Sequence, residues 1–227
     1  MIRLYLVRHG ENPANLTHEF SYRKVDYPLT EKGRLQAHQT AQCLAGVSFD
    51  VLATSPLRRA AETAQIIADL QTRPVSVFEE FREMHVGDLE GMVPQSEAWG
   101  RYAQMMRQWF GGHPEVPFPG GESRPELVGR FRRGLERLTE GLVDSRVLVV
   151  GHGGIFTHGV AELCEIADQK TFLGLENHNC SVSRVDMVRE GNRWRFVLVD
   201  WASVTHLSGE AAQVVQSVPE SARIKNL

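Results

Sequence analysis

The amino-acid sequence predicts an α/β fold, a three-layer α/β/α sandwich in which a mostly parallel sheet carries an antiparallel edge strand. First, apolar runs of strand length alternate with amphipathic segments of helical period along most of the 227 residues. Such alternation is typical of a parallel sheet with helices on both faces. Second, two apolar runs, 182–188 and 194–201, are separated by Glu190-Gly191-Asn192. That spacing predicts a β-hairpin, which brings antiparallel pairing to one edge of the sheet.

The individual elements follow from local patterns. Parallel strands are expected at the short apolar runs 4–7, 50–55, 74–78 and 146–151. Helical spacing of apolar side chains predicts helices at 31–44, 57–71, 96–110, 122–142 and 155–166. Thr30 is the expected N-cap of the first helix, and Gly46 is its expected stop.

The pattern predicts one domain over residues 1–205, with a helical insertion at about 92–142 and a C-terminal tail at 206–227. We expect the insertion to lie as a cap over the strand ends. The tail is small and polar with a few valines, so we expect it to be loosely held. The proline-punctuated stretch 12–29 reads as a long loop, and such loops often belong to a binding site.

Composition argues against several kinds of partner and site. The formal net charge is −3, so no global field attracts nucleic acid or an anionic membrane. The odd, widely spaced Cys43, Cys164 and Cys180 match neither a disulfide framework nor a Cys-x-x-Cys metal site. The first apolar run is too short for a signal peptide, and no run is long enough to span a bilayer. We expect a cytoplasmic protein, and the sequence leaves its oligomeric state open, with a homodimer as one option.

Chemically active side chains follow the predicted strands at the edge where open α/β sheets bind ligands. They are Arg8-His9-Gly10 after the first strand, Arg58-Arg59 in the first turn of a helix, Glu83 in a loop, and His152-Gly153 after the strand 146–151. Guanidinium groups bind phosphate oxygens, an imidazole attacks phosphorus, and a carboxyl group moves the proton. The inventory predicts phosphoryl transfer with no metal ion and no other cofactor, because the arginines supply the positive field and repel a cation.

Motifs that span the chain to about residue 180 carry a family resemblance. In chain order they are Leu6-Val7-Arg8-His9-Gly10-Glu11 with Asn15, Asp26 to Gly33, Ser55-Pro56-Leu57-Arg58-Arg59-Ala60 with Thr63-Ala64, Glu83 with Gly87 and Glu90-Gly91, Pro119 to Ser123, and Val150 to Gly154. This ordered set resembles the histidine phosphatase superfamily, in the branch that includes cofactor-dependent phosphoglycerate mutase. The resemblance implies a phosphoglycerate mutase-like sandwich and a histidine that is phosphorylated during turnover.

The resemblance also implies roles for single residues. His9 is similar to the family's nucleophile and Glu83 to its proton donor. Arg8, Arg59, Asn15 and Gly153 are implied as phosphate contacts, and His152 as a catalytic member of the same pocket. Arg59 is preferred to Arg58 because the family's arginine directly precedes the alanine, here Ala60. Further candidates for substrate contact are Ser21, Tyr22 and Arg23.

Physical chemistry adds expectations for these groups. His9 has to stay neutral to attack, and nearby arginines favour the neutral form by repulsion. Its other ring nitrogen is expected to donate to a backbone carbonyl, for which Gly10 is well placed. His152 is expected to be cationic, held so by phosphate. Arg58 is expected to be a surface charge, and Glu11 to pair with a nearby cation.

Three functions stay open at this point. A phosphatase that acts on small phosphate monoesters is favoured, because Arg101 and Arg107 stand apart in the insertion, where phosphoglycerate mutases carry an arginine pair. Without a second cationic site, a bisphosphorylated intermediate is retained less well, and water attacks the phosphohistidine instead. A cofactor-dependent phosphoglycerate mutase of the same fold is the alternative, and a catalytically silent module that binds phosphorylated ligands is the third.

Overall fold

A single six-stranded sheet forms the middle layer of the protein. The computed structural model describes residues 1–219 apart from 94, 192 and 217. The strands are β1 (Ile2–Arg8), β2 (Val51–Thr54), β3 (Val75–Val77), β4 (Arg146–Gly151), β5 (Val182–Glu190) and β6 (Arg193–Ser203). Their order is β3-β2-β4-β1-β5-β6. The first four in this order pair in parallel, whereas β5 runs antiparallel to β1 and β6 antiparallel to β5. The predicted antiparallel edge is therefore confirmed.

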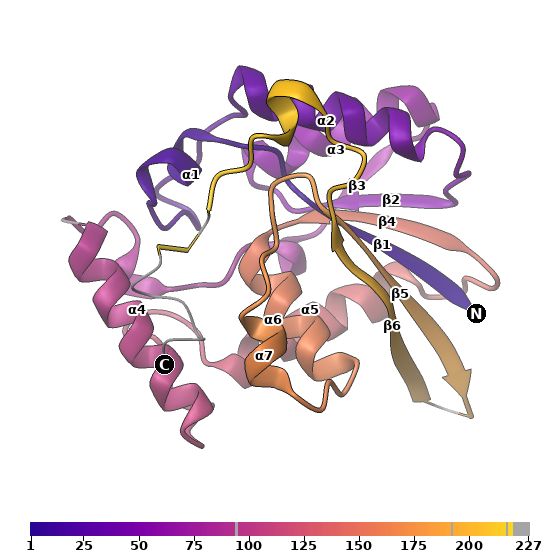
Figure 1. Ribbon diagram of the computed structural model, residues 1–227. Helices are drawn as coiled ribbons and strands as arrows, with labels where there is room; N and C mark the ends of the chain where they lie inside the picture. Colours follow the sequence, from indigo (N-terminus) through magenta and orange to yellow (C-terminus); the bar gives the residue numbers. More distant parts are fainter. Residues whose placement is uncertain (94, 192, 217, 220–227) are drawn as a thin grey trace.

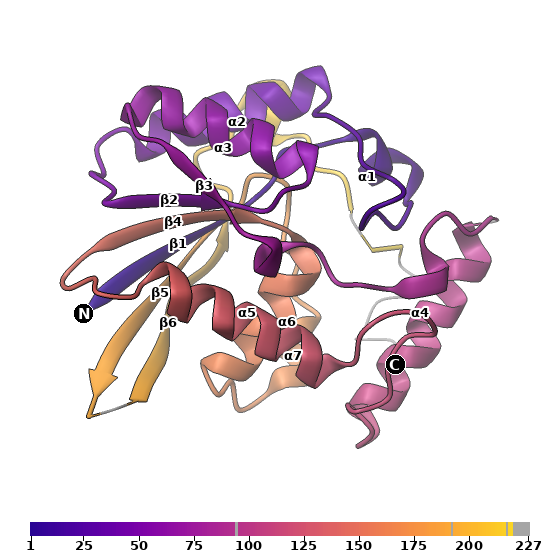
Figure 2. The same cartoon turned by 180° about the vertical axis from the view of Figure 1, so that it is seen from behind.

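Helices cover both faces of the sheet (Figure 1). One layer holds α2 (Glu31–Leu44) and α3 (Arg58–Gln71), which pack against each other. The opposite layer holds α5 (Arg124–Leu138) and α6 (Gly153–Leu163), with α7 (Gln169–Leu173) beside α6. The view from behind shows the same three layers (Figure 2). The predicted α/β/α sandwich is confirmed.

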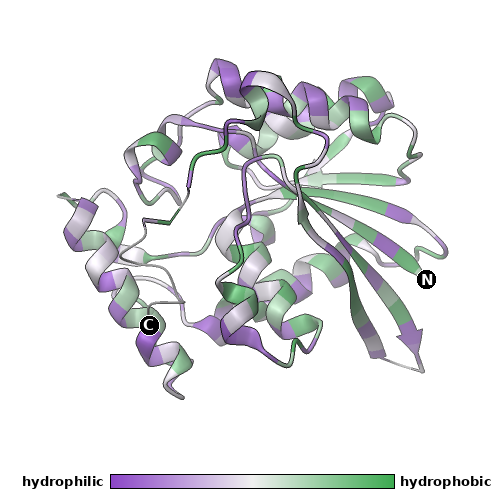
Figure 3. Ribbon diagram, in the orientation of Figure 1, coloured by the Kyte–Doolittle hydropathy of each residue, from purple (hydrophilic) through white to green (hydrophobic). Residues whose placement is uncertain are grey.

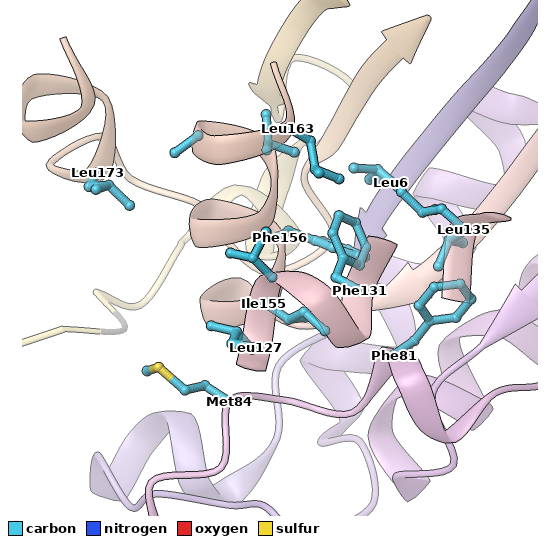
Figure 4. Close-up of a cluster of buried hydrophobic side chains, with 14 of the residues drawn as sticks. Leu6, Phe81, Met84, Leu127, Phe131, Leu135, Ile155, Phe156, Leu163 and Leu173 are labelled. Carbon is cyan, nitrogen blue, oxygen red and sulfur yellow. The ribbon is translucent and has the colours of Figure 1, made fainter. Parts of the chain in front are cut away.

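Alternate residues of the central strands feed two apolar cores. Leu4 and Leu6 join the core beneath α5 and α6, while Tyr5 and Val7 join the core beneath α2 and α3. This follows from the period of two along a strand. The central strands are accordingly mainly apolar (Figure 3). Figure 4 shows the first core, where Phe131 of α5 meets Phe156 of α6 with 5.9 Å between ring centroids.

Local sequence fixes how the chain enters α2. Thr30 caps this helix, because its hydroxyl accepts a hydrogen bond from the Gly33 backbone N–H (3.0 Å). Gly33 and Gly10 lie in direct backbone contact: a Cβ on Gly10 would lie 2.4 Å from the Gly33 carbonyl oxygen. The two glycines therefore let the start of α2 pack against the turn that follows β1.

Two short helices were missed because they are too short to show a period. α1 (Pro13–Thr17) lies inside the stretch 12–29 that was expected to be irregular. Its N-cap is Asn12, and Asn12 and Asn15 each accept a hydrogen bond from the other's backbone N–H. α7 was also missed, and Asp168 caps it. Each has five residues, fewer than two helical turns.

The expectation of a loosely held tail is wrong for its first part. A short 3₁₀ helix, Gly209–Ala212, packs beside α2. Ala211 is fully buried, and its carbonyl oxygen accepts a hydrogen bond from the side chain of Gln36 (3.1 Å). A few apolar side chains thus suffice to hold a polar segment when the surface they meet is complementary.

The two helices of the stretch 92–142 lie in different parts of the fold. α4 (Gln95–Phe110) stands away from the sheet, on the side towards which β1 runs (Figure 1), whereas α5 packs against α6 on the sheet. Only α4 therefore has the position expected of a cap. No helix in the described part of the chain is long and apolar enough to cross a bilayer.

Candidate active site

A pocket opens at the carboxyl ends of the parallel strands. It encloses about 1210 Å³ of non-protein space, open solvent at its mouth included. The polar residues that line it include Arg8, His9, Asn12, Asn15, Ser21, Arg59, Glu83 and Gly153. The strand ends predicted to meet at one edge of the sheet do so here.

His9 presents one ring nitrogen as an acceptor. Its Nε2 accepts a hydrogen bond from Nε of Arg59 (3.1 Å), and a guanidinium nitrogen can only donate. The proton therefore sits on Nδ1, which donates to the Gly10 carbonyl oxygen (2.7 Å). The expected tautomer and its carbonyl partner are confirmed.

His9 is held in its neutral form. The side chain is 3% exposed, and burial is the largest cause that lowers its pKa well below the ordinary value of a histidine. The positive charges of Arg59 and Arg8 lower the pKa of His9 further. At neutral pH, Nε2 of His9 therefore carries no proton, and its lone pair accepts the hydrogen bond from Arg59.

Two buried arginines stand beside this histidine. Arg59 donates from Nη1 to the Ser21 hydroxyl (2.8 Å) and from Nη2 to the Ser21 carbonyl oxygen (3.0 Å). Arg8 donates from Nη1 to the Asn177 carbonyl oxygen. Burial lowers the pKa of each arginine to about 10, so both remain cationic at neutral pH. The pocket therefore holds two positive charges beside Nε2 of His9.

Arg58 faces away from this site. It is exposed, so the preference for Arg59 over Arg58 agrees with the geometry. The Arg58 backbone N–H donates to Oδ1 of Asp26 (3.0 Å), and the same oxygen lies 3.9 Å from Nη1 of Arg59. A carboxylate of the chain itself thus compensates the two cations at the start of α3. Glu11 is likewise paired, with 2.5 Å between its Oε2 and Nζ of Lys32.

His152 lies directly behind His9. Its ring centroid is 5.1 Å from that of His9, and its Nε2 shares a hydrogen bond with the Ser55 hydroxyl (2.7 Å). The ring is fully buried and is not among the residues that line the pocket. Burial, followed by the charge of Arg59, lowers the pKa of His152 well below its ordinary value. The protein by itself favours the neutral ring, so the expected cation requires the negative charge of a phosphate.

Glu83 closes the other side of the pocket against the start of α6. Its Oε1 accepts hydrogen bonds from the backbone N–H groups of Ile155 (2.9 Å) and Met84 (2.8 Å), and its Oε2 accepts one from Gly154 (3.0 Å). Gly154 is required for this approach, because a Cβ there would lie 2.7 Å from Oε1. Oε2, with the fewer donors, is the oxygen with room to carry a proton.

Within the described part of the chain, no three histidine, cysteine, aspartate or glutamate side chains are grouped so that they can hold a metal ion.

The comparison with protein families decides the identity. The family model described as "Histidine phosphatase superfamily (branch 1)" matches residues 4–201. The chain belongs to the histidine phosphatase superfamily.

Relatives of this histidine phosphatase carry two kinds of name. A Bacillus subtilis protein named "Uncharacterized phosphatase PhoE" is 33% identical over 210 residues, which cover 92% of this chain and 98% of the relative. A Photorhabdus laumondii protein named "Probable phosphoglycerate mutase GpmB" is also 33% identical, over 95% of this chain and 100% of the relative.

Solved structures show the same fold. A histidine-to-alanine mutant of phosphoserine phosphatase from Entamoeba histolytica, in complex with phosphoserine, is similar with a TM-score of 0.77 and 27% identity, over 92% of this chain and 100% of that one. The mycobacterial glucosyl-3-phosphoglycerate phosphatase in complex with VO3 is similar with a TM-score of 0.74 and 26% identity, over 88% and 98% of the two chains.

Sequence reasoning missed Asn12, which lines the pocket of this histidine phosphatase and is 1% exposed. Its Oδ1 accepts a hydrogen bond from the Asn15 backbone N–H (3.2 Å), which fixes the orientation of the amide. Its Nδ2 has no hydrogen-bond partner among the described residues. A polar residue directly after Glu11, at a helix start, was the available signal. Asn15 also lines the pocket, and its Oδ1 accepts from Nδ2 of Asn179 (3.1 Å).

Of the three further substrate-contact candidates, the pocket reaches only Ser21; Tyr22 and Arg23 do not line it. The Tyr22 ring stacks on that of His85 with 4.1 Å between centroids, and Arg23 is exposed above Tyr22. The cause is Glu90, whose Oε1 accepts from the backbone N–H groups of residues 22–25 at 2.6 to 3.1 Å. This buried carboxylate turns the loop so that Ser21 alone faces Arg59.

Proposed function

We propose that the protein hydrolyses small phosphate monoesters through a phosphohistidine on His9, without a metal ion. The observation that carries the proposal is the state of His9. Nδ1 is fixed to a carbonyl oxygen, Nε2 keeps its lone pair, and Arg59 and Arg8 supply positive charge beside it. Such an arrangement suits attack on the phosphorus of an anionic ester.

In the first step, Nε2 of His9 attacks phosphorus and the bond from phosphorus to the ester oxygen breaks. Arg8 and Arg59 hold the phosphoryl oxygens, and Arg59 exchanges its bonds to His9 and Ser21 for bonds to these oxygens. Asn12, Asn15 and the backbone N–H of Gly153 supply further donors. Glu83 gives its proton to the departing alkoxide, so the alcohol leaves neutral.

In the second step, water attacks the phosphohistidine and the bond from phosphorus to Nε2 breaks. Glu83 takes one proton from the water, which restores its carboxyl group. Inorganic phosphate leaves, and His9 returns to its neutral form. While the phosphoryl group is in place, its negative charge favours the protonated ring of His152, which lies behind His9.

The surroundings of the pocket favour hydrolysis over a mutase reaction. Arg101 pairs with Glu97 at the surface (2.7 Å), and neither Arg101 nor Arg107 lines the pocket. A bisphosphorylated intermediate would thus meet no second pair of arginines among the described residues. The mutase remains the second candidate because relatives that match 95% of this chain carry the name "Probable phosphoglycerate mutase GpmB".

The test is a panel of phosphate esters assayed for released phosphate, with and without bisphosphoglycerate. We expect free phosphate in both conditions, a phosphoenzyme that acid destroys, and loss of both in His9→Ala. His38→Ala, at an exposed position of α2, is the matched control. Phosphoglycerate formed only when bisphosphoglycerate is present would establish the mutase, and full activity in His9→Ala would refute both.

A further inference from the structure

The pocket extends well beyond the groups that surround His9. Residues of α4, of the end of α1 and of the segment after α7 also line it. We call this part the outer compartment and define it by Phe20, Met84, Trp99, Tyr102, Leu173 and Leu175, all of which line the pocket. All six side chains are largely apolar. A phosphate ester held at His9 would place its alcohol part in this compartment.

The aromatic part of this wall is held in place by its own contacts. The ring centroids of Phe20 and Trp99 are 4.4 Å apart, and those of Trp99 and Tyr102 are 5.2 Å apart. Nε1 of Trp99 donates to the His18 carbonyl oxygen (2.8 Å), which ties α4 to the end of α1. These contacts fix the apolar surface before a ligand binds, so binding does not require a costly rearrangement of the side chains.

None of the six residues that define the outer compartment carries a charge. Among the described residues, Arg8 and Arg59 at the phosphate end are the only lysines or arginines that line the pocket. Glu19 and Glu176 also line the pocket, and the carboxylate of Glu176 lies near enough to Arg8 to raise the pKa of that guanidinium. Among the described pocket-lining residues, no lysine or arginine stands beside the outer compartment to pair with a carboxylate on the alcohol part of the substrate. Leu175, by contrast, is 48% exposed at this wall and gains by being covered.

We propose that the substrate is a phosphate monoester of an apolar, uncharged alcohol, alkyl or aryl, and that the outer compartment selects it by burying that group. This inference rests on the proposed function for the position of the phosphate. This preference would distinguish the protein from enzymes that act on phosphorylated sugar acids, because the carboxylate of such a substrate needs a cationic partner.

Binding of n-alkylphosphonates, which keep the phosphoryl group but cannot be hydrolysed as esters, tests the inference independently of turnover. We expect the Kd, measured by calorimetry, to fall roughly threefold to fourfold for each methylene from ethyl to hexyl, because each buried methylene transfers from water to an apolar wall. 3-Phosphonopropionate, with a carboxylate at its end, should bind more weakly than n-propylphosphonate. A Kd that stays level along the series, or equal binding of the carboxylate, would overturn the proposal.

Variants of Leu175, which is exposed at the outer compartment, distinguish selection for apolar groups from nonspecific apolar binding. Leu175→Lys, at an exposed position where a substitution should not disturb folding, should weaken the binding of hexylphosphonate and tighten the binding of 3-phosphonopropionate. Leu175→Gln should weaken the first without tightening the second. Gln104→Ala, on the exposed side of α4, is the control and should alter neither. If the phosphonates bind in the expected order but the protein hydrolyses no ester, the selection by the outer compartment is upheld and the proposed reaction is refuted. If the protein hydrolyses esters but the phosphonates do not bind in that order, the proposed reaction is upheld and the selection is refuted.

Discussion

Arg59 donates a hydrogen bond from Nε to Nε2 of His9, with 3.1 Å between the two nitrogens. The atom proposed to attack phosphorus is therefore held by the residue proposed to bind the phosphate. In the proposed reaction, an entering phosphate would draw the guanidinium away from His9, and this movement would expose the lone pair of Nε2. Recognition of the phosphate and release of the proposed nucleophile would then be one event.

Arg59→Lys keeps the charge but loses the planar group that spans His9 and Ser21. We expect kcat/KM to fall by about 100-fold or more, as when a preorganised oxyanion donor is removed. Arg59→Gln removes the charge as well, so the pKa of His9 should rise in that variant and not in Arg59→Lys. NMR titration of the His9 ring measures the difference, and an unchanged pKa in both would contradict the electrostatic account.

Glu83→Gln keeps a side-chain oxygen for the α6 backbone but removes the acid. We expect turnover of alkyl phosphates to fall by about 100-fold to 10,000-fold. Turnover of p-nitrophenyl phosphate should fall much less, because its leaving group departs without a proton. Steady-state kinetics on the two esters checks this. An equal loss on both would place Glu83 in positioning rather than in proton transfer.

His158→Phe tests the linkage of stability to pH. Burial lowers the pKa of His158 to about 3, so below its ordinary value near 6.5 the unfolded chain binds a proton that the folded protein does not. The contribution of this residue is complete above pH 6.5 and declines as the pH falls towards 3. Between pH 6 and 5, the free energy of unfolding of the variant should fall by up to about 1.4 kcal/mol less per pH unit than that of the unsubstituted protein. Urea unfolding of both proteins at several pH values measures this, and parallel curves would contradict it.

Gly154→Ala and Gly100→Ala form a matched pair. A Cβ on Gly154 meets Oε1 of Glu83 at 2.7 Å, whereas one on Gly100 of α4 meets nothing within 4 Å. We expect Gly154→Ala to displace Glu83 and lower kcat by roughly tenfold or more. Gly100→Ala should keep the activity and raise the unfolding free energy by about 0.5–1 kcal/mol. Activity assays with denaturant unfolding test both, and normal turnover in Gly154→Ala would show that the position of Glu83 tolerates the shift.

The sequence by itself determined the layers and the reactive inventory. Alternating apolar runs predict the parallel strands, and motifs of adjacent residues place Arg8, His9 and His152 at strand ends, because these signals are local. It did not determine the short helix behind Asn12 or the turn that Glu90 imposes on residues 22–25. Those features depend on single side chains reaching distant backbone groups.

Only the tertiary structure decided which atoms meet. The tautomer of His9 follows from Arg59, fifty positions along the chain, and the neutral form of His152 follows from burial that several elements create together. The outer compartment likewise joins residues from the segment after α1, from α4, and from α7 and the segment after it. A pattern along one segment carries none of this, because burial and pairing of charges are properties of the assembled fold.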